Sequence, residues 1–99
     1  MPEFLDVQHK YLSVTTATES SVDFGSYHGA VSIRNKGPAS VHVALDATAT
    51  GSDADGNILL EVGEPLNLPN VRFKTVSVYA LTDGASARVD IVATKGAQV

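Results

Sequence analysis

The sequence has 99 residues, of which 43% are hydrophobic and 18% are charged, and its net charge at neutral pH is −4. A chain of this size and apolar content fits one folded domain with one core and argues against intrinsic disorder. It contains no cysteine, which excludes disulfides and thiolate metal sites. Its seven lysines and arginines are spread singly along the chain, so we expect neither a basic patch nor a nucleic-acid partner.

The N-terminal third is the least regular part of the sequence. Phe4 to Val14 is rich in β-prone residues but changes phase near His9, and Val14 to Ser26 is rich in Ser and Thr with little periodicity. We therefore expect a long loop there, and we divide the chain into residues 1–21, an N-terminal arm or a first strand, and residues 22–99, a β-sandwich domain. No apolar stretch is long enough for a signal peptide or a membrane span, which predicts cytoplasmic synthesis and no membrane partner.

The middle of the chain alternates apolar and polar residues with the period of a half-buried strand. Val31 to Arg34 and Val41 to Asp46 both follow this pattern, and Asn35-Lys36-Gly37-Pro38 lies between them. Gly permits a positive φ and Pro fixes φ, so this tetrapeptide is typical of a turn. The pattern predicts a hairpin.

Three further strands are predicted towards the C-terminus. Ile58 to Val62 alternates after the Asp55-Gly56 turn, and Leu66 to Leu68, bounded by prolines, fits a sheet edge. Val71 to Leu81 switches its apolar face between Lys74 and Thr75, which indicates a bulge, and its second half is our candidate for a central strand. Ala87 to Ala93 is the last strand, which we expect to form a terminal hairpin with the one before it.

These elements predict an all-β fold, a single antiparallel β-sandwich or jelly roll of six to eight short strands. No segment repeats apolar residues at i, i+3, i+4 and i+7 over three turns, so no long helix is expected. One sheet alone would leave an apolar face in water, which favours two packed sheets. Phe73 and Tyr79 are the predicted aromatic anchors of the core.

Three motifs resemble functional sites, and we interpret each as structural. Asp53, Asp55, Asn57 and Glu64 fall at positions 1, 3, 5 and 12 of an EF-hand window, but Ile58 replaces the required Gly and no helices flank the loop, so we expect a solvated turn without calcium.

His9, His28 and His42 lack the spacing of metal ligands, so we interpret them as surface histidines. Gly25-Ser26-Tyr27-His28-Gly29 does not have the strand and helix context of a nucleophile elbow, and we interpret it as a flexible loop. No phosphate-binding loop occurs either. We therefore expect no catalytic residues, no metal, no cofactor and no enzymatic activity.

Five segments follow one another from Ala30 onward, which are Val-Ser-Ile-Arg-Asn-Lys-Gly from Val31, Val-His-Val-Ala-Leu from Val41, Val-Gly-Glu-Pro-Leu-Asn-Leu from Val62, Val-Ser-Val-Tyr-Ala from Val76 and Ala-Arg-Val-Asp-Ile-Val-Ala-Thr from Ala87. Their order resembles small virion proteins of tailed bacteriophages. It implies a virion location and a structural role as a capsid cement or decoration protein, with a head-tail or tail accessory part as the alternative. The implied partner is the major capsid protein or another virion protein, and the implied homo-oligomer is a trimer.

A second class of function stays open, that of a non-catalytic carbohydrate-binding module. Missing tryptophan and only three tyrosines count against it, because sugar sites use aromatic platforms. For a lattice-binding protein, the candidate partner-binding residues are the apolar side chains near the N-terminus, which lack one consistent face. These residues are Phe4, Leu5, Val7, Tyr11 and Leu12.

Overall fold

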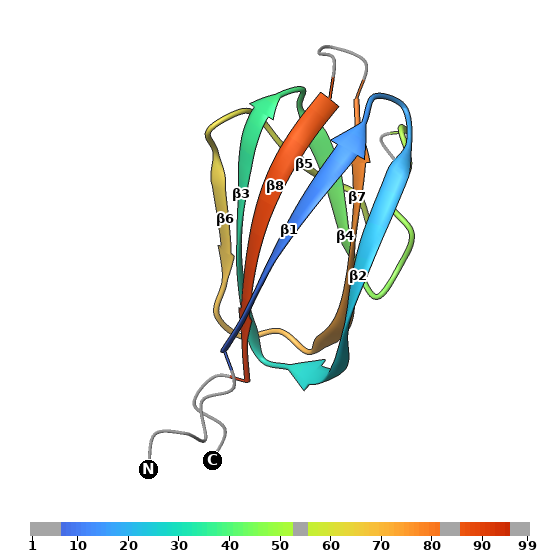
Figure 1. The fold of residues 1–99 in the computed structure, drawn as a ribbon. Helices are drawn as coiled ribbons and strands as arrows, with labels where there is room; N and C mark the ends of the chain where they lie inside the picture. The colour runs from blue at the N-terminus through green and yellow to red at the C-terminus, as the bar shows by residue number, and fades with distance from the viewer. Residues whose placement is uncertain (1–6, 53–55, 82–85, 96–99) are drawn as a thin grey trace.

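The structure is a computed structural model that describes residues 7–52, 56–81 and 86–95. Within these ranges the chain forms eight strands and no helix, arranged as two packed four-stranded antiparallel sheets (Figure 1). This confirms the all-β sandwich. The strands are β1 (Val7–Thr15), β2 (Glu19–His28), β3 (Ala30–Pro38), β4 (Val41–Leu45), β5 (Ile58–Leu60), β6 (Pro65–Leu68), β7 (Phe73–Ala80) and β8 (Ser86–Thr94).

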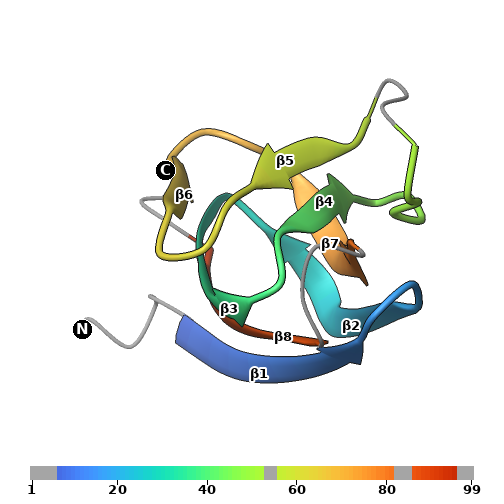
Figure 2. The same cartoon turned by 90° about the horizontal axis from the view of Figure 1, so that it is seen from above.

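The connectivity is that of a jelly roll. The first sheet has the order β1-β8-β3-β6 and the second sheet has the order β2-β7-β4-β5. β1 therefore pairs with β8, β2 with β7, β3 with β6 and β4 with β5, which is the pattern of one long hairpin rolled into a sandwich. Seen from above, the two sheets face each other across the core (Figure 2).

Both predicted hairpins are wrong. β3 lies in the first sheet and β4 in the second, and β7 and β8 are likewise in different sheets. Alternation fixes which side of a strand is buried, whereas a short connection can turn into the same sheet or cross to the other one. At Gly37-Pro38-Ala39-Ser40 the chain crosses, and Ala39 and Ser40 are buried between the sheets.

The expected loop over residues 14–26 is also wrong, because β2 occupies most of it. Ser20, Val22 and Phe24 face inward from β2, and Val22 and Phe24 contact the core. The residues 7–15 form a regular strand, so for this part of the chain the strand alternative describes the structure and the arm does not.

Strands near the C-terminus agree better with the predictions. β6 is an edge strand and β7 lies between β2 and β4, as expected of an edge and a central strand. The predicted bulge coincides with an irregularity, since the backbone N–H groups of Lys74 and Thr75 both donate to Asp46 Oδ1. Strand β5 ends at Leu60, and Val62 is 52% exposed beyond it.

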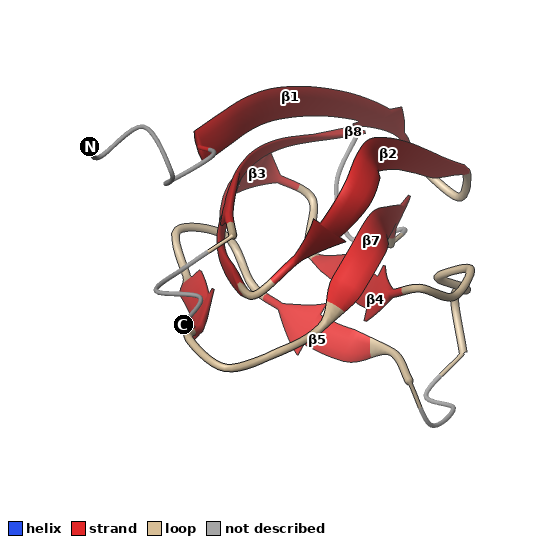
Figure 3. Cartoon of the chain, turned by 90° about the horizontal axis from the view of Figure 1, so that it is seen from below, coloured by secondary structure: helices blue, strands red, loops and turns tan. Residues whose placement is uncertain are grey.

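The core is aliphatic with two aromatic rings. Phe73 is fully buried, as predicted, and meets Phe24 edge to face with ring centroids 5.9 Å apart. Tyr79 does not anchor the core, because it lies on the outer side of β7 and is half-buried against Gly51. The β4–β5 connection covers this outer side, as the view from below shows (Figure 3).

Candidate functional site

The outer face of the first sheet carries most of the polar groups that the fold brings together. β3 and β8 alternate strictly, and β1 does so except at the exposed Lys10, so every second side chain points away from the core. Tyr11 lies opposite Asp90 and Asp90 opposite Arg34 in the strand register, which places side chains from three distant sequence segments in one row. The neighbouring positions on this face are His9, Ser32, Lys36, Arg88 and Val92.

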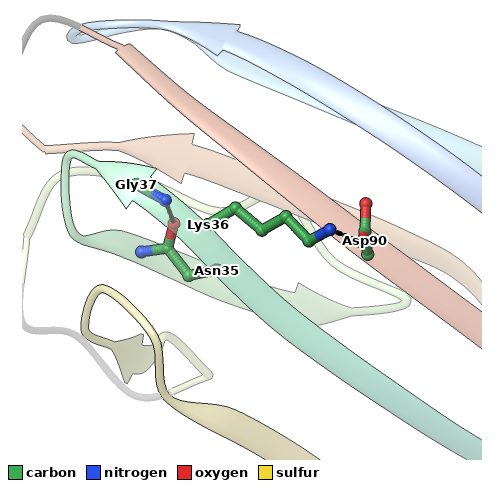
Figure 4. A network of polar contacts seen from close by, with 4 residues as sticks. All are labelled: Asn35, Lys36, Gly37 and Asp90. Carbon is green, nitrogen blue, oxygen red and sulfur yellow. Dashed lines mark hydrogen bonds and ion pairs between the residues drawn. The ribbon is translucent and has the colours of Figure 1, made fainter.

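Lys36 and Asp90 form an ion pair across β3 and β8. Lys36 Nζ lies 3.0 Å from Asp90 Oδ2, and Figure 4 shows the lysine side chain extended along the sheet surface towards the carboxylate. The lysine side chain is 49% exposed and the aspartate side chain 16% exposed. Water screens such a pair, so it contributes little to stability but fixes the positions of both side chains.

Beneath this pair, the buried amide of Asn35 fixes the end of β3. Asn35 Nδ2 donates to the carbonyls of Ala39 and Leu60, and Asn35 Oδ1 accepts the Gly37 N–H at 2.7 Å. Gly37 has φ 76°, and a Cβ there would lie 2.7 Å from a methyl carbon of Val62, so a side chain at this position would be strained. The outer-face side chains therefore project from a rigid support.

Tyr11 is held between two neighbours on the same surface. The Arg88 guanidinium lies over its ring, 4.4 Å from the centroid, and the His9 ring is 4.6 Å away and tilted. A cation over a tyrosine ring is attracted by about 0.5–1 kcal/mol at an exposed site. Tyr11 and Arg88 are thus ordered while Tyr11 stays 53% exposed.

Two shallow hollows adjoin each other on this face. The polar hollow has a volume of about 300 Å³ and is lined by His9, Ser32, Arg34, Lys36, Asp90 and Val92. The apolar hollow has about 330 Å³ and is lined by Ala30, Val31, Ser32, Asn67, Leu68, Pro69, Val92 and Thr94. Because Ser32 and Val92 belong to both, the surface changes continuously from apolar to charged.

The expectation that the cations form no patch is wrong. Arg34, Lys36 and Arg88 gather on the outer side of the first sheet, where Asp90 is the accompanying carboxylate. We call these three cations with Asp90 the basic face. The sequence does not reveal the group because β3 ends at Pro38 and β8 begins only at Ser86, and the spacing of single residues carries no information on that pairing.

Among the candidate partner-binding residues, the described ones divide between two sides of β1. Val7 and Tyr11 are 58% and 53% exposed on the outer side. Leu12 is half-buried and packs against the core. Phe4 and Leu5 lie outside the described residues.

Two of the three histidines are not on the surface, which corrects that expectation. His28 is 2% exposed, packs beside both Phe24 and Phe73, and places Nδ1 2.9 Å from the Ser26 carbonyl. His42 is 3% exposed, and its Nδ1 is 2.7 Å from the Thr50 carbonyl. Only His9 is exposed. In the part of the chain that the structure describes, no three His, Asp or Glu side chains lie together as metal ligands.

Asn57 and Glu64 of the EF-hand window have separate structural roles. The Asn57 side chain bonds to Thr50 and Ser52, whereas Glu64 Oε1 accepts the Glu61 N–H. Asp53 and Asp55 lie outside the described residues.

The segment Gly25 to Gly29 is not the expected flexible loop, because residues up to His28 belong to β2. The β2–β7 register shifts between Asp23 and His28, and Gly25 takes φ 82° there. His28 contacts the carbonyl of Ser26 rather than its hydroxyl. The Tyr27 ring lies under Arg72, 4.1 Å from the guanidinium carbon.

Comparison with known proteins identifies a fold and no family. No family model matches the chain, and no curated protein matches its sequence. One solved structure with a similar fold comes from Bacillus endospore appendages, described as a novel family of disulfide-linked pili. The TM-score is 0.51 at 14% identity, over 91% of this chain and 86% of that one. At this identity the likeness concerns the fold.

The described residues also contain no helix long and apolar enough to cross a membrane.

Proposed function

We propose that this chain is a non-catalytic structural protein of a virion, which binds as a cement or decoration protein to the outer surface of a phage head. A head-tail or tail position is the alternative site in the particle. In this proposal the protein is made in the host cytoplasm, binds the major capsid protein or another virion protein, and acts as a homo-oligomer, with a trimer favoured.

The observation that carries the proposal is the open edge of β1. β1 keeps one unbroken register with β8 from Val7 to Thr15, and in the described chain it has no strand partner on its other side. It diverges from β2 away from the turn that joins them (Figure 1). A long, regular edge strand offers backbone N–H and C=O groups to an added strand, and its outward Val7 and Tyr11 offer apolar contact area.

The other described edges are less suited to strand addition. β2 loses its regular register between Asp23 and His28, β6 begins with Pro65 and spans four residues, and β5 spans three. Bulges, prolines and short lengths are the usual means by which proteins protect sheet edges. On β1 the one such device is the exposed Lys10. The contrast singles out β1 as the edge for a partner.

Two further points support a structural role. The chain resembles phage virion proteins in the order of its segments, and the similar solved fold belongs to a pilus protein. That protein is described as disulfide-linked, whereas this chain contains no cysteine. Contacts made by this chain therefore contain no disulfide bond, and in this proposal they form through strand pairing and side-chain packing.

Binding to purified phage particles tests the proposal. The protein is titrated onto particles from its source, and bound protein is measured by cosedimentation and located by electron microscopy. We expect saturable binding that Val7→Lys weakens at least about tenfold, because a lysine charge buried in an apolar contact costs more than the roughly 1.4 kcal/mol that a factor of ten represents.

Leu59→Lys on β5 is the matched control, because Leu59 is 50% exposed and lies on another edge. It should bind particles like the unchanged protein. Absence of saturable binding would contradict the proposed function. An equal loss of particle binding in both variants would show that the β1 edge is not the contact.

The contacts of the tyrosine rings argue against the carbohydrate-binding alternative. Tyr11 lies under Arg88, Tyr27 lies under Arg72, and Gly51 lies against the ring of Tyr79. A ring face covered by a guanidinium is not available to stack on a sugar. Specific, saturable binding on a glycan array, abolished by Tyr11→Ala, would favour the alternative.

A further inference from the structure

The two outer surfaces of the sandwich carry opposite charge. The basic face lies on the first sheet, and three carboxylates, Glu19, Asp23 and Asp46, lie on the outer side of the second sheet. We call these three carboxylates the acidic face. The two sheets are packed against each other through the core, so the basic and acidic faces point in opposite directions (Figures 2 and 3).

The basic face is positively charged although the protein is acidic as a whole. Arg34, Lys36 and Arg88 outnumber Asp90 on it, while the whole chain has a net charge of −4. Arg34 lies beside the Lys36–Asp90 pair and lines the polar hollow. A cation-rich face on an acidic chain implies that the rest of the molecule holds an excess of negative charge.

The acidic face is built around a second polar hollow. Its volume is about 260 Å³, and no cation is among its described lining residues, which are Glu19, Ser21, Asp46, Ala47, Thr48, Thr75 and Ser77. Glu19 is held by the Ser77 hydroxyl and Asp23 accepts the Gly25 N–H. Arg72 and Lys74 lie beside Asp46 at the start of β7, so this side holds three carboxylates against two cations, and neither cation lines the hollow.

Asp46 keeps its charge on this face. Its Oδ1 accepts the N–H groups of Lys74 at 2.7 Å and Thr75 at 2.9 Å, and these hydrogen bonds hold its pKa below the usual value. The carboxylates of the acidic face are thus positioned by the fold and are not free side chains in a solvated loop.

We propose that copies of this chain stack head to tail, with the basic face of one copy on the acidic face of the next. The partner is a second copy of the chain, because each face finds a surface of opposite charge on the same molecule. Because the two contacting surfaces differ, the contact is heterologous, and repeating it builds a ring or an open filament rather than a two-fold dimer. The stacking does not depend on binding to a particle.

The size of the faces sets the strength of one contact. Nine residues in each of β1, β3 and β8 at about 3.3 Å each, and four strands about 4.8 Å apart, give a first-sheet face of at most roughly 30 by 19 Å. This is smaller than the roughly 800 Å² per partner of a standard interface. We therefore expect weak, concentration-dependent association of the isolated protein, strengthened at low salt because the Debye length grows from about 3 Å at 1 M to about 30 Å at 0.01 M.

Sedimentation of the purified full chain tests the stacking. At low ionic strength the weight-average mass should rise with concentration, and at 1 M salt the association should weaken by at least about tenfold. Arg34→Glu and Glu19→Lys should each reduce self-association by a similar factor. An equimolar mixture of the two variants should associate again, because the basic face of one variant meets the acidic face of the other.

Matched controls reverse charges elsewhere. Lys10→Glu on the β1 edge and Glu61→Lys after β5 change the net charge equally but lie on neither face, so they should leave association unchanged. Arg88→Glu and Asp23→Lys replace any face variant whose thermal melt shows loss of fold. A monomer at every concentration in low salt overturns the proposal, as does association that the face variants leave intact or that their mixture fails to restore.

Discussion

Phe73 and Tyr79 show how differently two aromatic residues of one strand contribute. Phe73 is fully buried between the sheets, whereas Tyr79 faces outward and contacts the β4–β5 connection. We expect Phe73→Ala to lower the free energy of unfolding by about 3–5 kcal/mol and Tyr79→Ala by clearly less, because the second change leaves no core cavity. Urea unfolding of both variants measures this, and equal losses would contradict the assigned orientation.

The histidines and Asn35 mark the limit of sequence reasoning at single residues. Alternation in β4 correctly places His42 opposite Val41 and Val43, on the outer side. It carries no information that residues 46–52 return over that side and bury His42. The sequence predicts Asn35 as a turn residue, whereas its side-chain amide donates to the carbonyls of Ala39 and Leu60. In both cases the missing information is a contact between distant segments.

At the scale of elements, the junction of β4 and β7 depends on one carboxylate. Asp46 has φ 55° at the end of β4, and its Oδ1 takes the two N–H groups left by the irregularity in β7. Those bonds lower its pKa below 3.8, chiefly through the Lys74 and Thr75 amides. A carboxylate with a lowered pKa in the folded state stabilises the protein above its unfolded-state pKa, and this contribution is lost as pH falls through the folded-state value.

We therefore expect stability to fall as the pH drops below about 4, and to fall less steeply in Asp46→Asn. Asparagine keeps an acceptor oxygen and tolerates a positive φ, so the variant removes the charge with little change of backbone. Thermal melts at pH 2 to 7 provide the measurement. Asp23→Asn is the control, because the Asp23 carboxylate accepts one backbone hydrogen bond, from the Gly25 N–H, instead of two. Parallel pH profiles for the original protein and Asp46→Asn would show that Asp46 does not contribute in this way.

Strand positions were easier to predict than strand partners. The segments of β3, β6 and β8 alternate clearly because each buries one side, whereas β4 is buried on both sides and β7 changes face near Lys74. β2 was missed because Ser20, Ser21 and Ser26 weaken its apolar pattern and its register shifts between Asp23 and His28. The predicted strand partners are wrong because the chain crosses into the other sheet after β3 and after β7, and no periodic pattern in the sequence marks either crossing. The basic and acidic faces depend on which strands pair, so neither face could be predicted from the sequence.

At the scale of the whole molecule, the jelly roll joins its first and last strands. β1 and β8 pair along their whole lengths, and Val14 of β1 is 2% exposed within the core. Such pairing is distant in sequence, so its loop-closure entropy is large, and the β1–β8 ladder forms only when both ends of the chain meet. The N-terminal strand is therefore part of the folding unit.

A chain that begins at Ser21 should lack a cooperative thermal transition. This chain lacks β1 altogether. The lost burial of Val14 and Leu12 costs about 1.5–3 kcal/mol for each side chain, and each lost interstrand hydrogen bond costs about 0.5–1.5 kcal/mol. Together these losses approach the whole free energy of unfolding of a typical domain, about 5–15 kcal/mol. A chain that begins at Val7 keeps every described strand and is the matched control, expected to unfold cooperatively. Calorimetry and near-ultraviolet circular dichroism of the two chains measure the difference. If the shorter chain also folds cooperatively, β1 is a detachable arm, and the edge that we assign to partner binding is then the edge of β8.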